Sequence, residues 1–191
     1  MPTVKEVLND TKKRLKEQGI DTYSLDSSLL VSEVTGLTKI QLVTHDRDEV
    51  TEEQINRLEN LVKERLKNKP MQYILGHCEF MGLDFKVTEN TLIPRGDTEN
   101  IVEEVIATIE NSGYNTVLDM CTGTGAIAIS VAHYTKAKVT ASDISSKALE
   151  VARENAKILN ADVNFIESDL FENINETFDV LVSNPPYIES E

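Results

Sequence analysis

The sequence predicts an α/β protein in which a small N-terminal bundle of helices precedes a parallel sheet covered by helices. Residues 1–70 contain segments with helical periodicity, each opened or closed by a capping signal. From residue 115 onward, short apolar strands alternate with helices, which is typical of a parallel sheet. A short hairpin pattern separates the two regions. We therefore expect a helical domain at 1–70, a β-hairpin connector at 71–95 and an α/β domain at 96–191.

Four helices are expected in the first region. Threonines followed three residues later by Glu or Gln predict three helix starts, namely Thr3 with Glu6, Thr38 with Gln41, and Thr51 with Gln54. A further apolar-rich helix covers Leu25–Val34 and stops at Gly36. The last helix is expected to end near Pro70. The bundle by itself carries no chemistry.

Residues 71–95 no longer show helical periodicity. Phe80 and Phe85 flank Gly82, which indicates a hairpin. Leu92–Arg95 follows as an extended segment. Asp97 is then expected to cap a helix whose apolar positions are Ile101, Val102, Val105, Ile106 and Ile109.

The third region contains the strand–helix alternation. The expected strands are Thr116–Met120, Lys138–Ser142, Val163–Glu167 and Phe178–Ser183. The helices between them are expected at Gly125–His133 and Ser145–Leu159. In such a sheet, the loops after the strands share one edge, where α/β proteins bind ligands.

Composition excludes several classes of protein. Residues 71–191 carry 7 Lys/Arg against 20 Asp/Glu, which disfavours direct binding of nucleic acid. Two separated cysteines, Cys78 and Cys121, fit neither a disulfide framework nor a metal cluster, so no metal is expected. The sequence has neither an apolar run of membrane-spanning length nor a secretory signal, so we expect a cytoplasmic protein without membrane contact. Its oligomeric state cannot be inferred.

The first candidate site is the loop Asp119–Gly125, which joins the first strand to its helix. Gly123 and Gly125 allow a ligand to approach the main chain, and the next helix offers free N–H groups. With Ala128, these glycines also match the G-x-G-x-x-A pattern of dinucleotide sites, so a nicotinamide cofactor stays open at this point. Asp143 after the second strand suits the ribose hydroxyls of either cofactor, or else caps a helix.

The second candidate site is Asn184-Pro185-Pro186-Tyr187, directly after the last apolar strand. Two prolines make this loop rigid. An Asn oxygen and a proline carbonyl can accept hydrogen bonds from one –NH2 group, while the Tyr ring packs on the planar group that carries it. This favours methyl transfer from S-adenosylmethionine to an amide or ring-amine nitrogen, without metal or histidine. We therefore interpret His45, His77 and His133 as surface or packing residues.

On these residues the sequence resembles the HemK/PrmC family, which methylates the glutamine of the Gly-Gly-Gln loop in peptide-chain release factors. The resemblance also covers Pro70–Gly76, Leu92–Arg95 and Asp97-Thr98-Glu99. It implies a Rossmann-like class I methyltransferase domain with strand order 3-2-1-4, and N-terminal helices that help to dock the release factor. Asn184-Pro185-Pro186-Tyr187 is shared with adenine-amino methyltransferases of DNA, so it is not specific alone.

The resemblance also implies roles for individual residues. The cofactor would contact Cys121, Thr122, Gly123, Thr124, Gly125, Asp143 and Asn184, with Asp169 and Leu170 bordering its adenine. The substrate amide would be held by Asn184, Pro185, Pro186 and Tyr187, with Asn184, Pro185 and Tyr187 as the catalytic group. Cys121 departs from the family, where many members have glycine.

Two alternatives stay open. One is a nucleic-acid amino (adenine) methyltransferase, and the other is a module that docks a translation factor without catalysis. Members of the family continue well beyond the last loop, whereas this chain ends at Glu191. We therefore expect a truncated form with weak or no activity.

Overall fold

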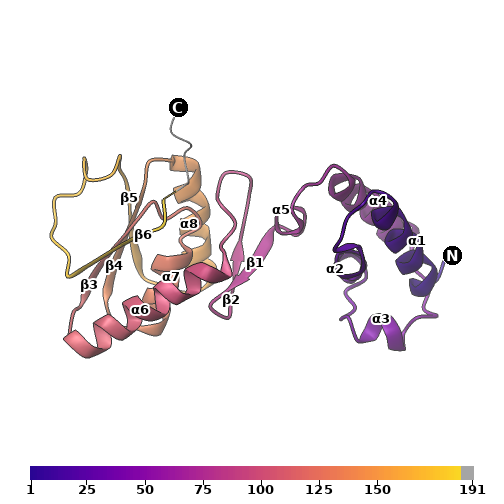
Figure 1. Ribbon diagram of the computed structural model, residues 1–191, viewed down its shortest axis with the longest axis horizontal. Coiled ribbons are helices and arrows are strands. Elements are labelled where there is room, and N and C mark those ends of the chain that lie inside the picture. Colours follow the sequence, from indigo (N-terminus) through magenta and orange to yellow (C-terminus); the bar gives the residue numbers. More distant parts are fainter. Residues whose placement is uncertain (186–191) are drawn as a thin grey trace. The chain divides into compact units, whose positions relative to one another are not determined.

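A computed structural model describes residues 1–185 and divides the chain into two compact units. The first unit is Met1–Leu75, and the second begins at Gly76. The first is helical and the second contains the parallel sheet, so the predicted α/β fold class is confirmed (Figure 1). None of the helices in residues 1–185 is both long and apolar enough to cross a bilayer.

The first unit consists of helices. They are α1 (Val4–Glu17), α2 (Tyr23–Thr35), α3 (Gln41–Thr44), α4 (Glu52–Leu66) and α5 (Met71–Leu75). The predicted capping boxes are present at α1 and α4, where each N-cap threonine and the Glu or Gln three residues later exchange hydrogen bonds. Arg65 on α4 pairs with the buried Asp26 on α2 at 2.7 Å, which joins these two helices. The short helix α5 was not predicted, because five residues give no periodicity to recognise.

The predicted hairpin is present, as β1 (His77–Phe80) and β2 (Leu83–Lys86). Phe80 and Phe85 are buried in the core of the second unit. The side chain of Asn155 accepts from the Lys86 N–H at 2.8 Å and donates to the Lys86 carbonyl at 3.0 Å. The hairpin is therefore an integral part of the second unit. The division into a docking domain, a connector and a catalytic domain stays a proposal.

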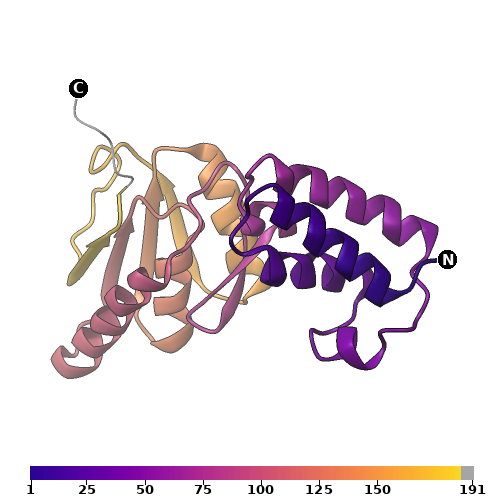
Figure 2. The ribbon, with the colours of Figure 1, turned by 45° about the vertical axis from the view of Figure 1, so that its right-hand side comes forward.

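The main sheet has four parallel strands, β3 (Thr116–Met120), β4 (Lys138–Asp143), β5 (Val163–Glu167) and β6 (Val180–Ser183). Their order is β5-β4-β3-β6, which confirms the predicted 3-2-1-4 arrangement (Figure 2). Because the strands are parallel, the loops that follow all four emerge at one edge. The glycine loop after β3 therefore lies beside the loop after β6.

Three helices accompany this sheet, α6 (Gly96–Ser112), α7 (Ala126–Tyr134) and α8 (Ser146–Ile158), with α7 in contact with both others. The prediction that Asp97 caps α6 is wrong. The N-cap is Arg95 and no side chain caps the helix, so Asp97 lies in the first turn, where the helix dipole favours an acidic residue. Arg95 pairs with Asp97 at 3.5 Å.

Candidate functional site

The glycine loop leaves β3 through a series of left-handed residues. Cys121, Gly123 and Gly125 have φ values of 63°, 55° and 80°. The Thr122 N–H donates to the Ser142 carbonyl of β4, and the Gly125 N–H donates to the Thr122 carbonyl, each at 2.9 Å. A Cβ built on Gly123 would meet nothing within 4 Å. The loop is therefore tightly folded, with open space beside its central glycine.

The carboxyl group of Asp119 holds the glycine loop in place through hydrogen bonds. Its side chain is fully buried, and its Oδ2 accepts from the Thr122 hydroxyl at 2.6 Å and the Ala128 N–H at 3.1 Å. Oδ1 is buried without a hydrogen-bond partner among the described residues. Burial raises the pKa of Asp119 to about 7, and the two hydrogen bonds offset only part of that rise. One carboxyl group thus fixes both the loop and the first turn of α7.

Asp143 lies at the end of β4, where its carboxylate meets the glycine loop. Oδ2 accepts from the Gly123 N–H and Oδ1 from the Ser145 N–H, each at 2.9 Å. The N-cap of α8 is Ser145, whose hydroxyl accepts from the Ala148 N–H, so the capping alternative for Asp143 is wrong. Each carboxylate oxygen can accept more than one hydrogen bond. Asp143 therefore keeps acceptor capacity for ribose hydroxyls.

Asp169 and Leu170 follow β5 and are both exposed. The Ser168 N–H donates to the Asp143 carbonyl at 3.0 Å, and the Ser168 hydroxyl donates to the Leu170 carbonyl at 2.9 Å. This places the turn after β5 next to Asp143. An adenine contact at Asp169 and Leu170 stays a prediction.

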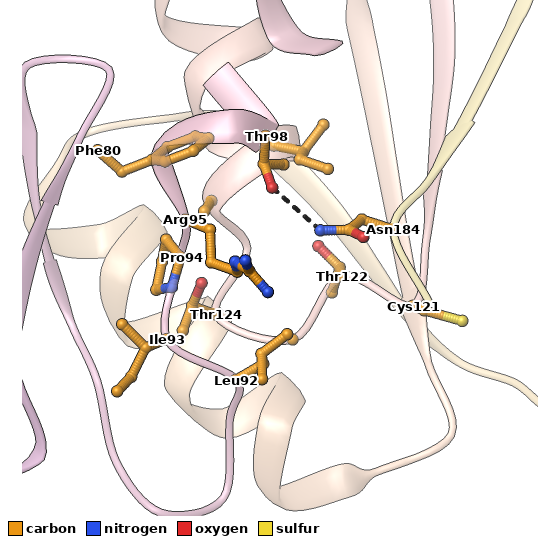
Figure 3. A pocket seen from close by; sticks show the side chains of 13 residues that line it. Phe80, Leu92, Ile93, Pro94, Arg95, Thr98, Cys121, Thr122, Thr124 and Asn184 are labelled. Carbon is orange, nitrogen blue, oxygen red and sulfur yellow. Dashed lines mark hydrogen bonds between the residues drawn. The ribbon is translucent and has the colours of Figure 1, made fainter. Parts of the chain in front are cut away.

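The loop after β6 begins at Asn184. The Ser183 hydroxyl donates to the Met120 carbonyl at 2.8 Å, which ties the end of β6 to the end of β3. The Asn184 Nδ2 donates to the Thr98 hydroxyl of α6 at 3.1 Å (Figure 3). Pro185 is exposed. Pro186 and Tyr187, which the sequence assigns to the same loop, lie outside the described residues.

A cavity joins the two predicted loops. Its volume is about 50 Å³, and it opens to solvent. Its lining residues are Phe80, Leu92, Ile93, Pro94, Arg95, Thr98, Cys121, Thr122, Gly123, Thr124, Ala126, Ile127 and Asn184 (Figure 3). Asp143, Asp169 and Leu170 are not among them. Gly125 and Pro185 do not line it either. The structure thus brings Cys121–Thr124 and Asn184 together and leaves these five predicted residues outside the cavity lining.

Some of the residues that line the cavity were not predicted as site residues. Phe80, Thr98 and the extended segment Leu92–Arg95 line the cavity, although the sequence indicated only a hairpin, a helix start and a connector. The signal that could have located them is their match to the family motif. The three histidines do not line the cavity. Within residues 1–185, no group of three or more His, Cys, Asp or Glu residues could hold a metal ion.

Burial raises the pKa of the Cys121 thiol, and the neighbouring Asp143, Asp119 and Asp169 carboxylates raise it further, although a hydrogen bond with Ser183 opposes them. The thiol is therefore protonated at neutral pH and is a weak nucleophile. Figure 3 shows the Cys121 sulfur directed away from the other labelled side chains. The contribution of this residue to the cavity is thus mainly its main chain.

Comparisons with known proteins identify relatives of the chain. Residues 6–76 match the PrmC N-terminal domain model, and residues 100–191 match the methyltransferase small domain model. The chain is 41% identical to the release factor glutamine methyltransferase of Clostridium acetobutylicum, over 98% of this chain and 68% of that protein. It is 43% identical to the enzyme of the same name from Fusobacterium nucleatum, over 97% of this chain and 54% of that protein.

Among solved structures, the Pyrococcus abyssi tRNA (uracil-54, C5)-methyltransferase in complex with S-adenosyl-L-homocysteine is similar, with 26% identity and a TM-score of 0.50. The match covers 58% of this chain and 28% of that one. The shared part is therefore a methyltransferase fold, and it accounts for somewhat more than half of the present chain.

Proposed function

We propose that this chain, which belongs to the release factor glutamine methyltransferase family, transfers the methyl group of S-adenosylmethionine to a glutamine side-chain amide of a peptide-chain release factor. The observation that carries the proposal is the shared cavity. The glycine loop and Asn184, which are far apart in the sequence, line the same space. A cofactor on one wall and an amide on the other would then face each other.

The glycine loop is suited to the cofactor. Cys121–Gly125 would hold it through the main chain, because Gly123 leaves open space where any other residue would place a side chain. Asp143 would accept from the ribose hydroxyls while its carboxylate keeps the Gly123 N–H in place. When bound, S-adenosylmethionine supplies a methyl group already activated by its sulfonium, so no metal or general base is needed for the attack.

Asn184 and the main chain of the adjoining loop would hold the substrate. The lone pair of an amide nitrogen is delocalised, so the nitrogen is a poor nucleophile. If the Asn184 Oδ1 and the Pro185 carbonyl accept from the –NH2 group, they hold the lone pair toward the methyl carbon. They also stabilise the positive charge that grows on nitrogen as the N–C bond forms. The nitrogen then loses a proton to solvent. The proposed catalytic group is Asn184, Pro185 and Tyr187, with Pro186 stiffening the loop.

The first unit would contribute docking. We propose that its helices position the release factor in the cytoplasm, and that the enzyme makes no direct contact with nucleic acid or membrane. The acidic balance of residues 71–191 supports this, since a groove for nucleic acid needs cationic side chains.

The test is a methylation assay with labelled S-adenosylmethionine and three substrates. The first is a release factor, the second is the same factor with its Gly-Gly-Gln glutamine changed to glutamate, and the third is an adenine-containing oligonucleotide. The proposal predicts label in the first substrate alone. Label in the oligonucleotide would favour the nucleic-acid enzyme instead. Binding of the release factor without any calorimetric binding of S-adenosylmethionine would favour a docking module.

A further inference from the structure

The motif Asp97-Thr98-Glu99 opens α6, and each of its side chains ties the helix to a different segment. Asp97 pairs with Arg95 at 3.5 Å. The Glu99 Oε1 accepts from the Met81 N–H of the hairpin turn at 2.7 Å. The Thr98 hydroxyl accepts from the Asn184 Nδ2 at 3.1 Å. The start of α6 thus contacts the residue on which the proposed chemistry depends.

A carboxamide alone does not fix its own orientation. The terminal torsion of Asn is broad and roughly two-fold, so the amide can present either its oxygen or its –NH2 group to a neighbour. Ser183 anchors the main chain before Asn184 to the Met120 carbonyl. This bond leaves the Asn184 side chain free to rotate. Some other group must therefore select one orientation.

Thr98 makes the side-chain hydrogen bond that holds the observed orientation, because its hydroxyl accepts from the Asn184 Nδ2 at 3.1 Å. The residue is 8% exposed, and its main-chain N–H donates to the Arg95 carbonyl at 2.9 Å, which fixes its backbone in the first turn of α6. With Nδ2 directed at Thr98, the Oδ1 of Asn184 is directed away from it (Figure 3). A flipped amide would offer a donor to the substrate –NH2 group, which is itself a donor.

We propose that Thr98 is a positioning residue that holds the Asn184 carboxamide with its oxygen available to the substrate amide. This rests on the proposed function of Asn184. When the Thr98 hydroxyl is absent, both amide orientations are populated, and only one of them accepts from the substrate. The effect falls on the rate of transfer and spares the affinities for cofactor and protein substrate.

The direct test is the NMR signal of the Asn184 side-chain amide in the whole chain, assigned by its loss in Asn184→Asp. Thr98→Val removes the hydroxyl with little change in volume, whereas Thr98→Ser keeps it. We expect the Asn184 amide signals to move in Thr98→Val and to stay near their wild-type position in Thr98→Ser. The Asn155 amide, which donates to the Lys86 and Thr124 carbonyls, reports whether the fold is intact. An unmoved Asn184 signal in Thr98→Val overturns the proposal.

The second readout is kinetic. Thr98→Val is expected to lower kcat by roughly tenfold, in line with the loss of one hydrogen bond, and to leave both KM values within about twofold. Thr98→Ser should restore most of the loss. Thr140→Val is the matched control, because Thr140 is also buried, at 6% exposure, and does not line the cavity. An equal loss in Thr140→Val, or a loss confined to KM, contradicts a positioning role. If the wild-type chain transfers no methyl group, as the expectation of weak or no activity allows, the kinetic readout does not apply and the NMR result alone decides the role of Thr98.

Discussion

Gly125 offers the sharpest test of how the glycine loop is built. It is the N-cap of α7 and has a φ of 80°, which L residues with a side chain rarely adopt. A Cβ at this position would lie 2.8 Å from the Ile129 Cδ1 and 3.2 Å from the Ala152 Cβ, with the Ala152 Cα at 3.5 Å. The Ile129 side chain can rotate away. Ala152 is part of α8, so α7 and α8 would have to separate.

The cost of Gly125→Ala follows from these two effects. A left-handed conformation costs an L residue about 1–2 kcal/mol, and overpacking a tight contact typically adds about 1–3 kcal/mol. We therefore expect the second unit to lose about 3 kcal/mol of unfolding free energy. Gly123→Ala has the same backbone requirement, at a φ of 55°, but no neighbour within 4 Å, so it should lose only about 1 kcal/mol.

Urea unfolding followed by circular dichroism gives the stability, and hydrogen exchange of the β3 and β4 amides assigns the change to the second unit. Gly96→Ala serves as the control, because Gly96 is helical, has no positive φ and has no neighbour within 4 Å. It should be neutral or slightly stabilising. A Gly125→Ala variant no less stable than Gly123→Ala would refute the close approach of α7 and α8.

Three further predictions concern the residues around the loop. Burial raises the Asp119 pKa from 3.8 to about 7, so its contribution to stability is present below pH 4 and is lost as the pH rises to 7. In urea unfolding from pH 4 to 8, the unfolding free energy of Asp119→Asn should rise relative to that of the wild type by up to roughly 4 kcal/mol and then level off. A difference in unfolding free energy that stays constant with pH would contradict this. Cys121 has a φ of 63°, a backbone conformation that is strained for a residue with a Cβ, and Cys121→Gly removes this strain. Glycine also has a larger conformational entropy in the unfolded chain, and after this is subtracted the variant should be more stable by about 0.5–1 kcal/mol. A destabilised variant would be evidence against strain at this position. Asp143→Ala removes the carboxylate that accepts from the Gly123 and Ser145 N–H groups. Calorimetry should then show the affinity for S-adenosylmethionine reduced about tenfold or more. An unchanged affinity would mean that the ribose binds elsewhere.

Much of the fold follows from local patterns in the sequence. Reciprocal capping at Thr3 and Thr51 located two helix starts, because a capping box depends on residues only three positions apart. The strand Thr116–Met120 has the predicted limits, and all but its first residue are buried. The start of α6 was misplaced by two positions, from Arg95 to Asp97, because a lone Asp is favoured both as a cap and in the first turn.

The cavity could be predicted only in part. The carboxyl ends of parallel strands share an edge, so the proximity of the glycine loop to Asn184 follows from topology. The bond between Thr98 and Asn184 does not, because it joins side chains 86 positions apart in the sequence and depends on how α6 packs. The burial of Asp119 was equally hidden, since an acidic residue at the end of a strand gives no indication of whether water reaches it.

We propose that Asn184 and the glycine loop form one methyl-transfer site for a glutamine amide. Mass spectrometry tests this on a release factor incubated with S-adenosylmethionine and either the wild-type chain or Asn184→Ala. We expect one added methyl group on the Gly-Gly-Gln glutamine with the wild type, and a rate lower by about two orders of magnitude with Asn184→Ala. Methylation of that glutamine at an equal rate by both proteins, or of a different residue, would contradict it.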